Sequence, residues 1–138
     1  MYHRIRQLAL CLMVLAFVTT VSAYTTDQAS KGKDFYVKCC AVCHGAGGEG
    51  GTVPEQFGKK LAGMKVPRLV GPGFLPGMKD VGQVYDFAKK NMPGNKPASL
   101  KSDEYLAVIS FALQANAVKP DDKPLTPDSA KEIKLGGK

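Results

Sequence analysis

The chain has 138 residues, a length that suits one domain and leaves little room for two. With 44% hydrophobic and 22% charged residues, it has the composition of an ordinary globular protein. Its formal charge is +7, but it has no clustered run of Lys and Arg and no interleaving of basic with aromatic residues. The charge therefore does not indicate nucleic-acid binding.

The first 23 residues follow the three-part pattern of a secretory signal peptide. Arg4 and Arg6 make the start basic, the run from Leu8 to Val18 is apolar, and small residues end at Ala23. An uncleaved anchor is the alternative, but the apolar run is shorter than the roughly 18 to 20 residues that span a bilayer. We expect cleavage after Ala23, which removes two arginines and no acid and takes the formal charge from +7 to +5.

A first helix is expected over residues 26–42, with Thr26 or Asp27 as its N-cap. Its expected apolar face is formed by Ala29, Phe35, Tyr36, Val37 and Cys40. Gly32 lies inside this helix, where it costs about 1 kcal/mol relative to alanine. Close approach of another helix would explain the glycine.

The motif Cys40-Ala41-Val42-Cys43-His44 at the end of this helix is the attachment signature of c-type haem. In a helical turn, Cys40 and Cys43 stand on one face at i and i+3, and His44 follows at i+4. The thiols would form thioethers with the porphyrin vinyl groups, and the histidine would ligate the iron. We predict one covalent haem c, attached through Cys40 and Cys43.

A C-x-x-C pair can also be a redox dithiol or half of a zinc site. A zinc site normally needs a second pair of ligands, but the other Cys and His residues are only His3, Cys11 and Cys39. Two of these three fall in the predicted signal peptide. A redox dithiol of the thioredoxin type would need a βαβ context, which the sequence lacks.

The middle of the chain is rich in Gly and Pro. Residues 45–51 are expected to form a flexible loop, which lacks the lysine and serine of a phosphate-binding loop. Residues 54–61 are a candidate short helix with Pro54 in its first turn. Residues 67–74 are expected to pass along the haem as an extended loop.

A third helix is expected from Asp80, as its cap, to about Asn91. Its expected buried stripe is Val81, Val84, Tyr85 and Ala88. Met92 follows at the end of this helix and precedes Pro93. A methionine thioether is a soft ligand suited to the sixth position of haem iron, so Met92 is the candidate distal ligand, with Met64 and Met78 as competitors.

The last long helix is expected over residues 102–115, capped by Ser99 or Ser102. Its expected apolar face is Tyr105, Val108, Ile109, Ala112 and Leu113. Residues 118–138 contain three prolines and one candidate helical turn over 128–133. No internal repeat and no convincing strand is recognised, which predicts an all-α protein.

The sequence resembles class I c-type cytochromes over essentially the whole mature chain. Gly32 and Tyr36 precede Cys40 at the spacings of that family's first helix, and Phe111 with Val108 resembles the partner pair on its last helix. The resemblance implies the cytochrome c fold, with three to five helices and loops around one haem. It also implies that the first and last helices cross at the glycine.

The resemblance extends to two further haem contacts. Residues 67–71 are similar to the family's P-x-L-x-G element. By this resemblance, the Pro67 carbonyl would accept a hydrogen bond from Nδ1 of His44, and Leu69 would pack on the porphyrin. Met92-Pro93 is similar to the family's distal motif, and Tyr85 and Phe87 would line the ring.

A narrower resemblance, over residues 91–117, is to cytochromes that accept electrons from quinoprotein alcohol dehydrogenases. It implies redox-protein partners, and the basic mature chain favours acidic docking faces on them. Candidate docking lysines are Lys59, Lys60, Lys65, Lys89, Lys90 and Lys96. Cys39 departs from the usual pattern because it offers a second possible first thiol; in the regular register it remains a free thiol.

The sequence thus predicts a signal peptide over 1–23, a cytochrome c domain over 24–118 and a Pro-rich tail over 119–138. It predicts a periplasmic, monomeric, one-electron carrier rather than an enzyme, because no constellation of catalytic acid, base or nucleophile is recognised. Two alternatives remain open. One is a gas-binding or peroxidase-like haem protein with a labile distal site, and the other is a haem subunit of a larger redox complex.

Overall fold

A computed structural model describes residues 23–72, 75 and 77–136. The described chain is mainly helical, which confirms the all-α prediction. Its helices are α1 (Thr26–Cys39), α2 (Ala41–His44), α3 (Val81–Asn91), α4 (Ser102–Ala115) and α5 (Pro127–Glu132). None of the helices in these residues is long and apolar enough to cross a membrane. The predicted signal peptide lies outside the described residues, except for Ala23.

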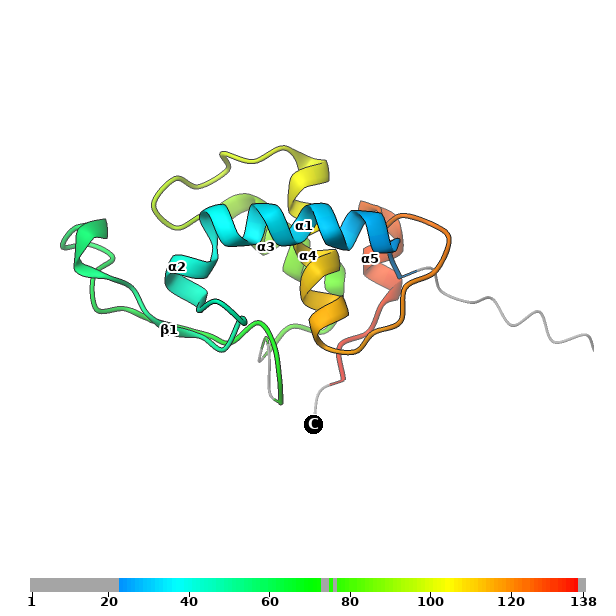
Figure 1. The fold of residues 1–138 in the computed structure, drawn as a ribbon, viewed down its shortest axis with the longest axis horizontal. Helices are drawn as coiled ribbons and strands as arrows, with labels where there is room; N and C mark the ends of the chain where they lie inside the picture. The colour runs from blue at the N-terminus through cyan, green and yellow to red at the C-terminus, as the bar shows by residue number, and fades with distance from the viewer. Residues whose placement is uncertain (1–22, 73–74, 76, 137–138) are drawn as a thin grey trace, which may run out of the picture.

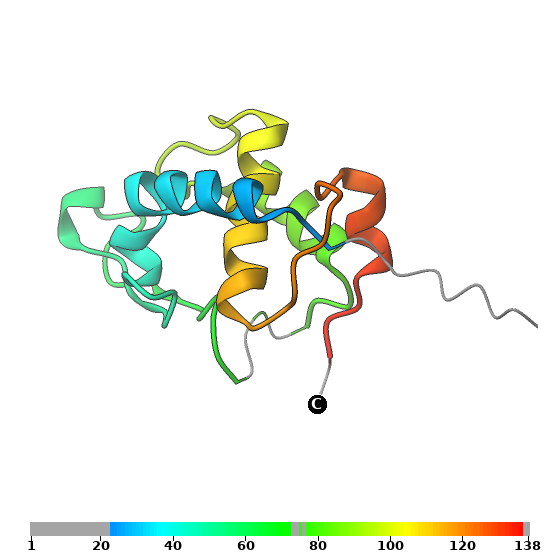
Figure 2. The ribbon, with the colours of Figure 1, turned by 45° about the vertical axis from the view of Figure 1, so that its right-hand side comes forward.

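Helices α1 and α4 cross each other at the centre of the molecule (Figures 1 and 2). A Cβ atom built on Gly32 would lie 1.8 Å from the backbone oxygen of Ala107, so only glycine allows this contact. Beside the crossing, the rings of Tyr36 and Phe111 pack with their centroids 5.0 Å apart. The close approach of a second helix expected at Gly32, and the role of Phe111 on its partner, are therefore confirmed.

The first predicted helix is divided in two by a break at Cys40. Helix α1 begins at Thr26 as expected, but its N-cap is Thr25 rather than Thr26 or Asp27, because the Thr25 side chain accepts a hydrogen bond from Gln28 N at 3.2 Å. It ends at Cys39, and α2 begins at Ala41. The predicted apolar face was also wrong at Val37, whose side chain is 62% exposed.

Between α2 and α3 the chain forms a short hairpin that extends to one side of the molecule (Figure 1). Strands β1 (Gly51–Thr52) and β2 (Lys65–Val66) pair antiparallel, with Gly51 opposite Val66 and Thr52 opposite Lys65. The expectation of no strand was wrong in this respect. The helix expected over 54–61 is reduced to one 3-10 turn, η1 (Glu55–Phe57), because Gly58 follows with a positive φ of 77°.

The two helices that follow have the predicted extents but only one of the predicted caps. The Asp80 side chain accepts a hydrogen bond from Gln83 N at 2.9 Å, which confirms it as the cap of α3. The N-cap of α4 is Lys101, not Ser99 or Ser102, and its N–H donates to the Glu104 carboxylate at 2.7 Å. That bond satisfies a backbone donor at the helix start, as in a capping box.

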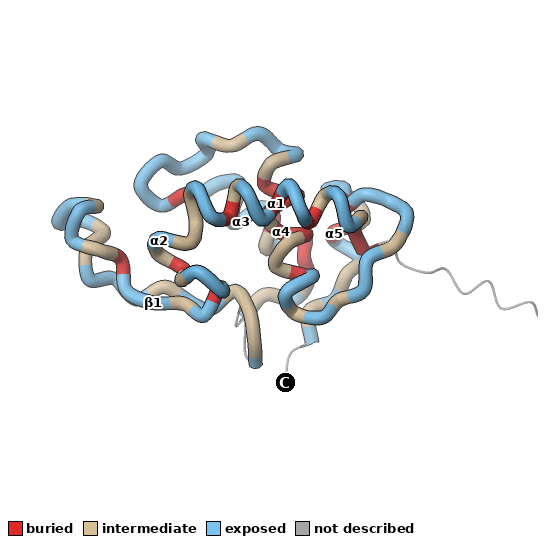
Figure 3. The backbone as a smooth tube through the Cα atoms, viewed as in Figure 1, coloured by how far each residue is buried: buried red, intermediate tan, exposed pale blue. Residues whose placement is uncertain are grey.

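The main core lies where α1, α3, α4 and the C-terminal segment meet, as the buried positions in Figure 3 indicate. Its members from α4 are Tyr105, Leu106, Ile109 and Leu113. The tail contributes Leu125 and Ala130, which are 2% and 0% exposed. The Pro-rich tail is therefore part of the core.

Candidate functional site

A largely apolar cavity of about 330 Å³ lies between α2, α3, α4 and the hairpin. Such a volume is in the range of ligand and cofactor sites. The six residues predicted to hold haem all line this cavity: Cys40, Cys43, His44, Pro67, Leu69 and Met92. The structure therefore brings together residues that are up to 52 positions apart in the sequence.

The short helix α2 presents the C-x-x-C-H motif on one wall of the cavity. Its turn is closed by hydrogen bonds from Cys43 N and His44 N to the Cys40 carbonyl, at 3.1 and 2.9 Å. After the helix, the Tyr36 hydroxyl donates to the Gly45 carbonyl at 2.6 Å. Because Tyr36 belongs to α1, this bond fixes the end of α2 to the helix crossing.

The imidazole of His44 is oriented by the backbone of the Pro67 loop. Its Nδ1 atom lies 3.1 Å from the Pro67 carbonyl oxygen, and the residue is 7% exposed. A carbonyl only accepts, so Nδ1 carries the proton and Nε2 keeps its lone pair. Burial lowers the pKa of His44, and the Pro67 bond partly opposes this shift. Burial is the larger of the two effects and favours the neutral imidazole, the form that ligates metals.

Asn116, at the C-terminal end of α4, holds the loop that contains Pro67. Its amide oxygen accepts from Gly71 N at 2.9 Å, and its amide nitrogen donates to the Leu69 carbonyl at 2.8 Å. The sequence analysis did not identify this role. Its only sequence signal is an amide residue one position after a predicted helix end, a signal that many surface residues share.

Met92 lines the same cavity and continues the cavity face of α3 (Val81–Asn91). Val84, Ala88 and Met92 recur at intervals of four residues, and all three line the cavity. Met92 N donates to the Ala88 carbonyl at 2.9 Å, and the Tyr105 hydroxyl donates to the Met92 carbonyl at 2.6 Å. The backbone of Met92 is therefore fixed from both α3 and α4.

The other candidate residues are divided between the cavity, the core and the surface. Met64 and Met78 also line the cavity, so it holds three thioethers. Phe87 lines it as expected and is 47% exposed. Tyr85 does not, because its side chain faces the main core instead. The six lysines proposed for docking are all exposed.

The thiols of Cys40, in the motif, and of Cys39, which precedes it, both have a raised pKa. Burial raises the pKa of Cys40 to about 12, and the neighbouring Cys39 and Cys43 add to this effect. Burial also raises the pKa of Cys39, whose Sγ atom donates to the Phe35 carbonyl at 2.9 Å. No cluster of three or more His, Cys, Asp and Glu side chains suited to a bare metal ion is found among residues 23–72, 75 and 77–136.

Two thiols, a neutral imidazole, a thioether and many apolar side chains around one cavity suit a haem group. The family model for subunit III of cbb3-type cytochrome c oxidase matches residues 27–111. The chain belongs to this family. It is a class I c-type cytochrome domain, and its cofactor is haem c. A cytochrome c domain is an electron carrier and not an enzyme.

One solved structure supports the same fold. The crystal structure of the sulfane dehydrogenase SoxCD from Paracoccus pantotrophus aligns with a TM-score of 0.53 at 24% identity. The alignment covers 78% of this chain and 52% of the other, so the chain spans about half the length of that neighbour. No curated protein matches the sequence.

Proposed function

We propose that this protein is an exported, periplasmic cytochrome that carries one haem and passes one electron at a time between redox proteins. The observation that carries the proposal is the meeting of Cys40, Cys43, His44 and Met92 around one apolar cavity. When bound, haem supplies an iron that cycles between the ferric and ferrous states. The residues of the chain hold the group, orient its ligands and keep water away.

The proposed attachment uses Cys40 and Cys43, each forming one thioether with a porphyrin vinyl group. Both side chains line the cavity from the same helical turn as His44. Cys39 also lines the cavity, but it stands at the end of α1, before the break in the helix. The regular C-x-x-C-H register therefore remains the proposed one, with Cys39 as a free thiol.

The proposed axial ligands are Nε2 of His44 and the thioether of Met92. The His44 tautomer is supported by the Pro67 bond, which places the proton on Nδ1. Met92 is favoured over Met64 because Met64 is 52% exposed, whereas Met92 is half-buried with its carbonyl bonded to Tyr105. With haem bound, this Met/His pair would raise its reduction potential.

Partner docking is proposed at the exposed apolar residues that also line the cavity, Met64 and Phe87. Lysines flank both: Lys65 follows Met64, and Lys89 and Lys90 follow Phe87 on α3. A partner with an acidic face would be steered towards these lysines, and its association rate would fall as the salt concentration rises. The resemblance of residues 91–117 supports a quinoprotein alcohol dehydrogenase as the electron donor.

A second candidate function is that of a haem subunit in a larger redox complex. The matching family is named for a subunit of an oxidase, which favours this candidate. Purification of the protein from its native membranes and soluble fraction distinguishes the two functions. A fixed stoichiometric ratio to a large partner would support the subunit, and a free monomer would support the diffusing carrier.

The attachment is tested by the mass of the denatured, matured protein together with a redox titration. We expect the mass of the mature chain plus one haem, and a one-electron transition. Cys39→Ser should leave the mass addition unchanged, whereas Cys40→Ser with Cys43→Ser should abolish covalent haem. Loss of haem in Cys39→Ser alone would contradict the proposed register, and a mass without haem in the wild type would contradict the proposed function.

A further inference from the structure

The segment from Leu125 to Leu135, here called the C-terminal strap, is bonded to the start of α3. Val81 N donates to the Ile133 carbonyl at 3.0 Å, and Leu135 N donates to the Lys79 carbonyl at 3.1 Å. Asp80 and Lys134 form an antiparallel bridge between these bonds. The first N–H groups of a helix have no partner within it, so the strap satisfies one that α3 leaves open.

The other end of the strap is bonded to α1. The side-chain amide of Gln28 accepts from Leu125 N at 2.7 Å and donates to the Leu125 carbonyl at 3.0 Å. The Leu125 side chain is 2% exposed and belongs to the main core. The backbone of the strap is therefore hydrogen-bonded at both ends, to the Gln28 side chain of α1 and to the backbone at the start of α3.

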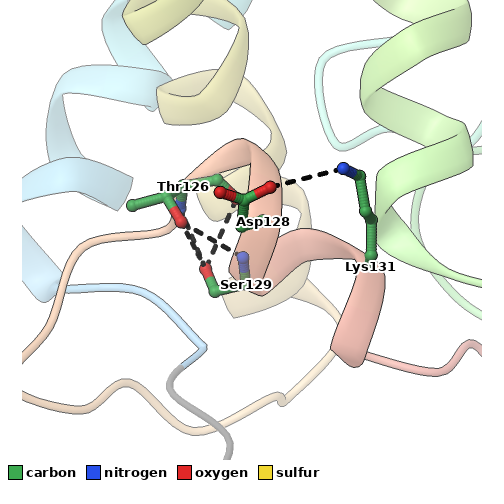
Figure 4. Close-up of polar contacts among 4 residues, drawn as sticks. All are labelled: Thr126, Asp128, Ser129 and Lys131. Carbon is green, nitrogen blue, oxygen red and sulfur yellow. Dashed lines mark hydrogen bonds and ion pairs between the residues drawn. The ribbon is translucent and has the colours of Figure 1, made fainter.

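Between these ends, helix α5 (Pro127–Glu132) packs closely on α3. A Cβ atom on Gly82 would lie 2.7 Å from Cγ and 3.2 Å from Cα of Lys131. The helix is stabilised locally by its own side chains (Figure 4): the Thr126 hydroxyl accepts from Ser129 N at 3.1 Å, and Lys131 pairs with Asp128 at 3.3 Å. The strap is thus a structured element in close contact with α3.

The strap also reaches the cavity. Leu135 lines it, beside Val81 and Val84 on the cavity face of α3 that ends in Met92. At about 1.5 Å per residue, the 11 residues of α3 connect the strap to Met92 through one rigid helix of roughly 16 Å. The strap lies wholly beyond residue 111, where the family match ends.

We propose that the C-terminal strap supports the haem site, with Leu135 as a positioning residue. It fixes the helix that presents Met92, and the Leu135 side chain keeps water from the α3 wall of the cavity. This inference rests on the proposed function, because it concerns the ligand and the hydration of the same haem. Solvent exposure is one of the factors that set the reduction potential of a haem.

The test compares Leu135→Asn with Leu135→Met in the full-length, matured protein, by redox titration and by carbon monoxide binding to the ferrous form. Leu135→Asn should favour the oxidised form by about tenfold at a fixed potential, which is about 59 mV for one electron. Carbon monoxide binding should increase. Leu135→Met should return both readouts to near wild type. Val37→Asn, a similar change at an exposed residue of α1, should change neither.

A second variant loosens the strap without touching the cavity. Gln28→Ala removes both bonds to Leu125, so we expect α3 to be held less firmly and carbon monoxide binding to increase. The strap proposal is overturned if Leu135→Asn and Gln28→Ala lower the melting temperature but keep the wild-type potential and carbon monoxide binding. If the wild type already binds carbon monoxide as readily as Met92→Ala, the assignment of Met92 as a ligand is wrong. That outcome differs from the one that overturns the strap proposal.

Discussion

The Tyr105 hydroxyl donates a hydrogen bond of 2.6 Å to the backbone carbonyl of Met92. Tyr105 is on the first turn of α4 and is 3% exposed. The bond therefore connects the proposed distal ligand to the helix that also crosses α1. The same ligand is connected to the C-terminal strap through α3.

Tyr105→Phe should loosen Met92 while keeping the aromatic packing. We expect a loss of about 1 kcal/mol in the free energy of unfolding, because the Met92 carbonyl loses a buried partner. The fraction of ferrous protein that binds carbon monoxide should rise. Tyr85→Phe is the matched control, since no hydrogen bond of the Tyr85 hydroxyl is found among the described residues. Equal carbon monoxide binding by both variants would contradict the role given to Tyr105.

Asn116→Ala should destabilise the loop that orients His44. The substitution removes the bonds to Gly71 N and the Leu69 carbonyl, at about 1 kcal/mol for each of these half-buried bonds. Asn116→Asp keeps the acceptor for Gly71 N and loses the donor to the Leu69 carbonyl. Its midpoint of urea denaturation should therefore lie between those of Asn116→Ala and the wild type. If both variants unfold at the wild-type midpoint, Asn116 does not support the loop.

Gly32→Ala should separate the two crossing helices. The added Cβ would lie 1.8 Å from the Ala107 oxygen, a backbone atom that cannot move alone. Overpacking of this kind costs about 1–3 kcal/mol or more, and the melting temperature measures it. Gly94→Ala is the control, because a Cβ there meets no atom within 4 Å. Similar melting temperatures for the two variants would argue against the crossing.

Local sequence signals were sufficient for much of this structure. The C-x-x-C-H motif and the Asp80 cap involve residues within one or two helical turns, so their spacing alone defines them. Gly32 was informative because a glycine inside a helix needs a reason, and the reason is a contact with α4. The resemblance to class I cytochromes added the His44 to Pro67 contact, which no local pattern contains.

The features that were missed depend on contacts between distant segments. Leu125 is buried and Leu135 is partly buried, although both belong to the Pro-rich tail, and their burial depends on contacts with the main core. Val37 has the spacing of a buried residue, yet α4 crosses α1 on its other side. The break at Cys40 belongs to the turn that presents the motif to the cavity, which helical periodicity cannot show.

The stability of the protein should fall at alkaline pH through Tyr36. Burial raises the pKa of this hydroxyl to about 12, whereas in an unfolded chain it titrates near 10. The unfolded chain loses the Tyr36 proton at a lower pH than the folded protein does. The contribution of Tyr36 to the free energy of unfolding is therefore complete below about pH 10 and is lost between about pH 10 and 12. Urea unfolding followed by far-UV circular dichroism at about pH 9.5 and 11.5 measures the loss.

Tyr36→Phe should make this alkaline loss smaller, although the variant is less stable at neutral pH because the bond to the Gly45 carbonyl is gone. Burial also raises the pKa of Tyr24, so part of the alkaline loss should remain. Tyr85→Phe serves again as the control. A pH dependence that is the same in Tyr36→Phe and wild type would assign the loss to other groups.

The most direct test of the central claim is the absorption spectrum of the matured ferrous protein with and without carbon monoxide at neutral pH. We expect a low-spin wild type that does not bind carbon monoxide, and a Met92→Ala variant that binds it. Met64→Ala and Met78→Ala should behave as the wild type, which makes them matched controls from the same cavity. Ready binding by the wild type, or an open iron in Met78→Ala and not in Met92→Ala, would contradict the assignment of Met92.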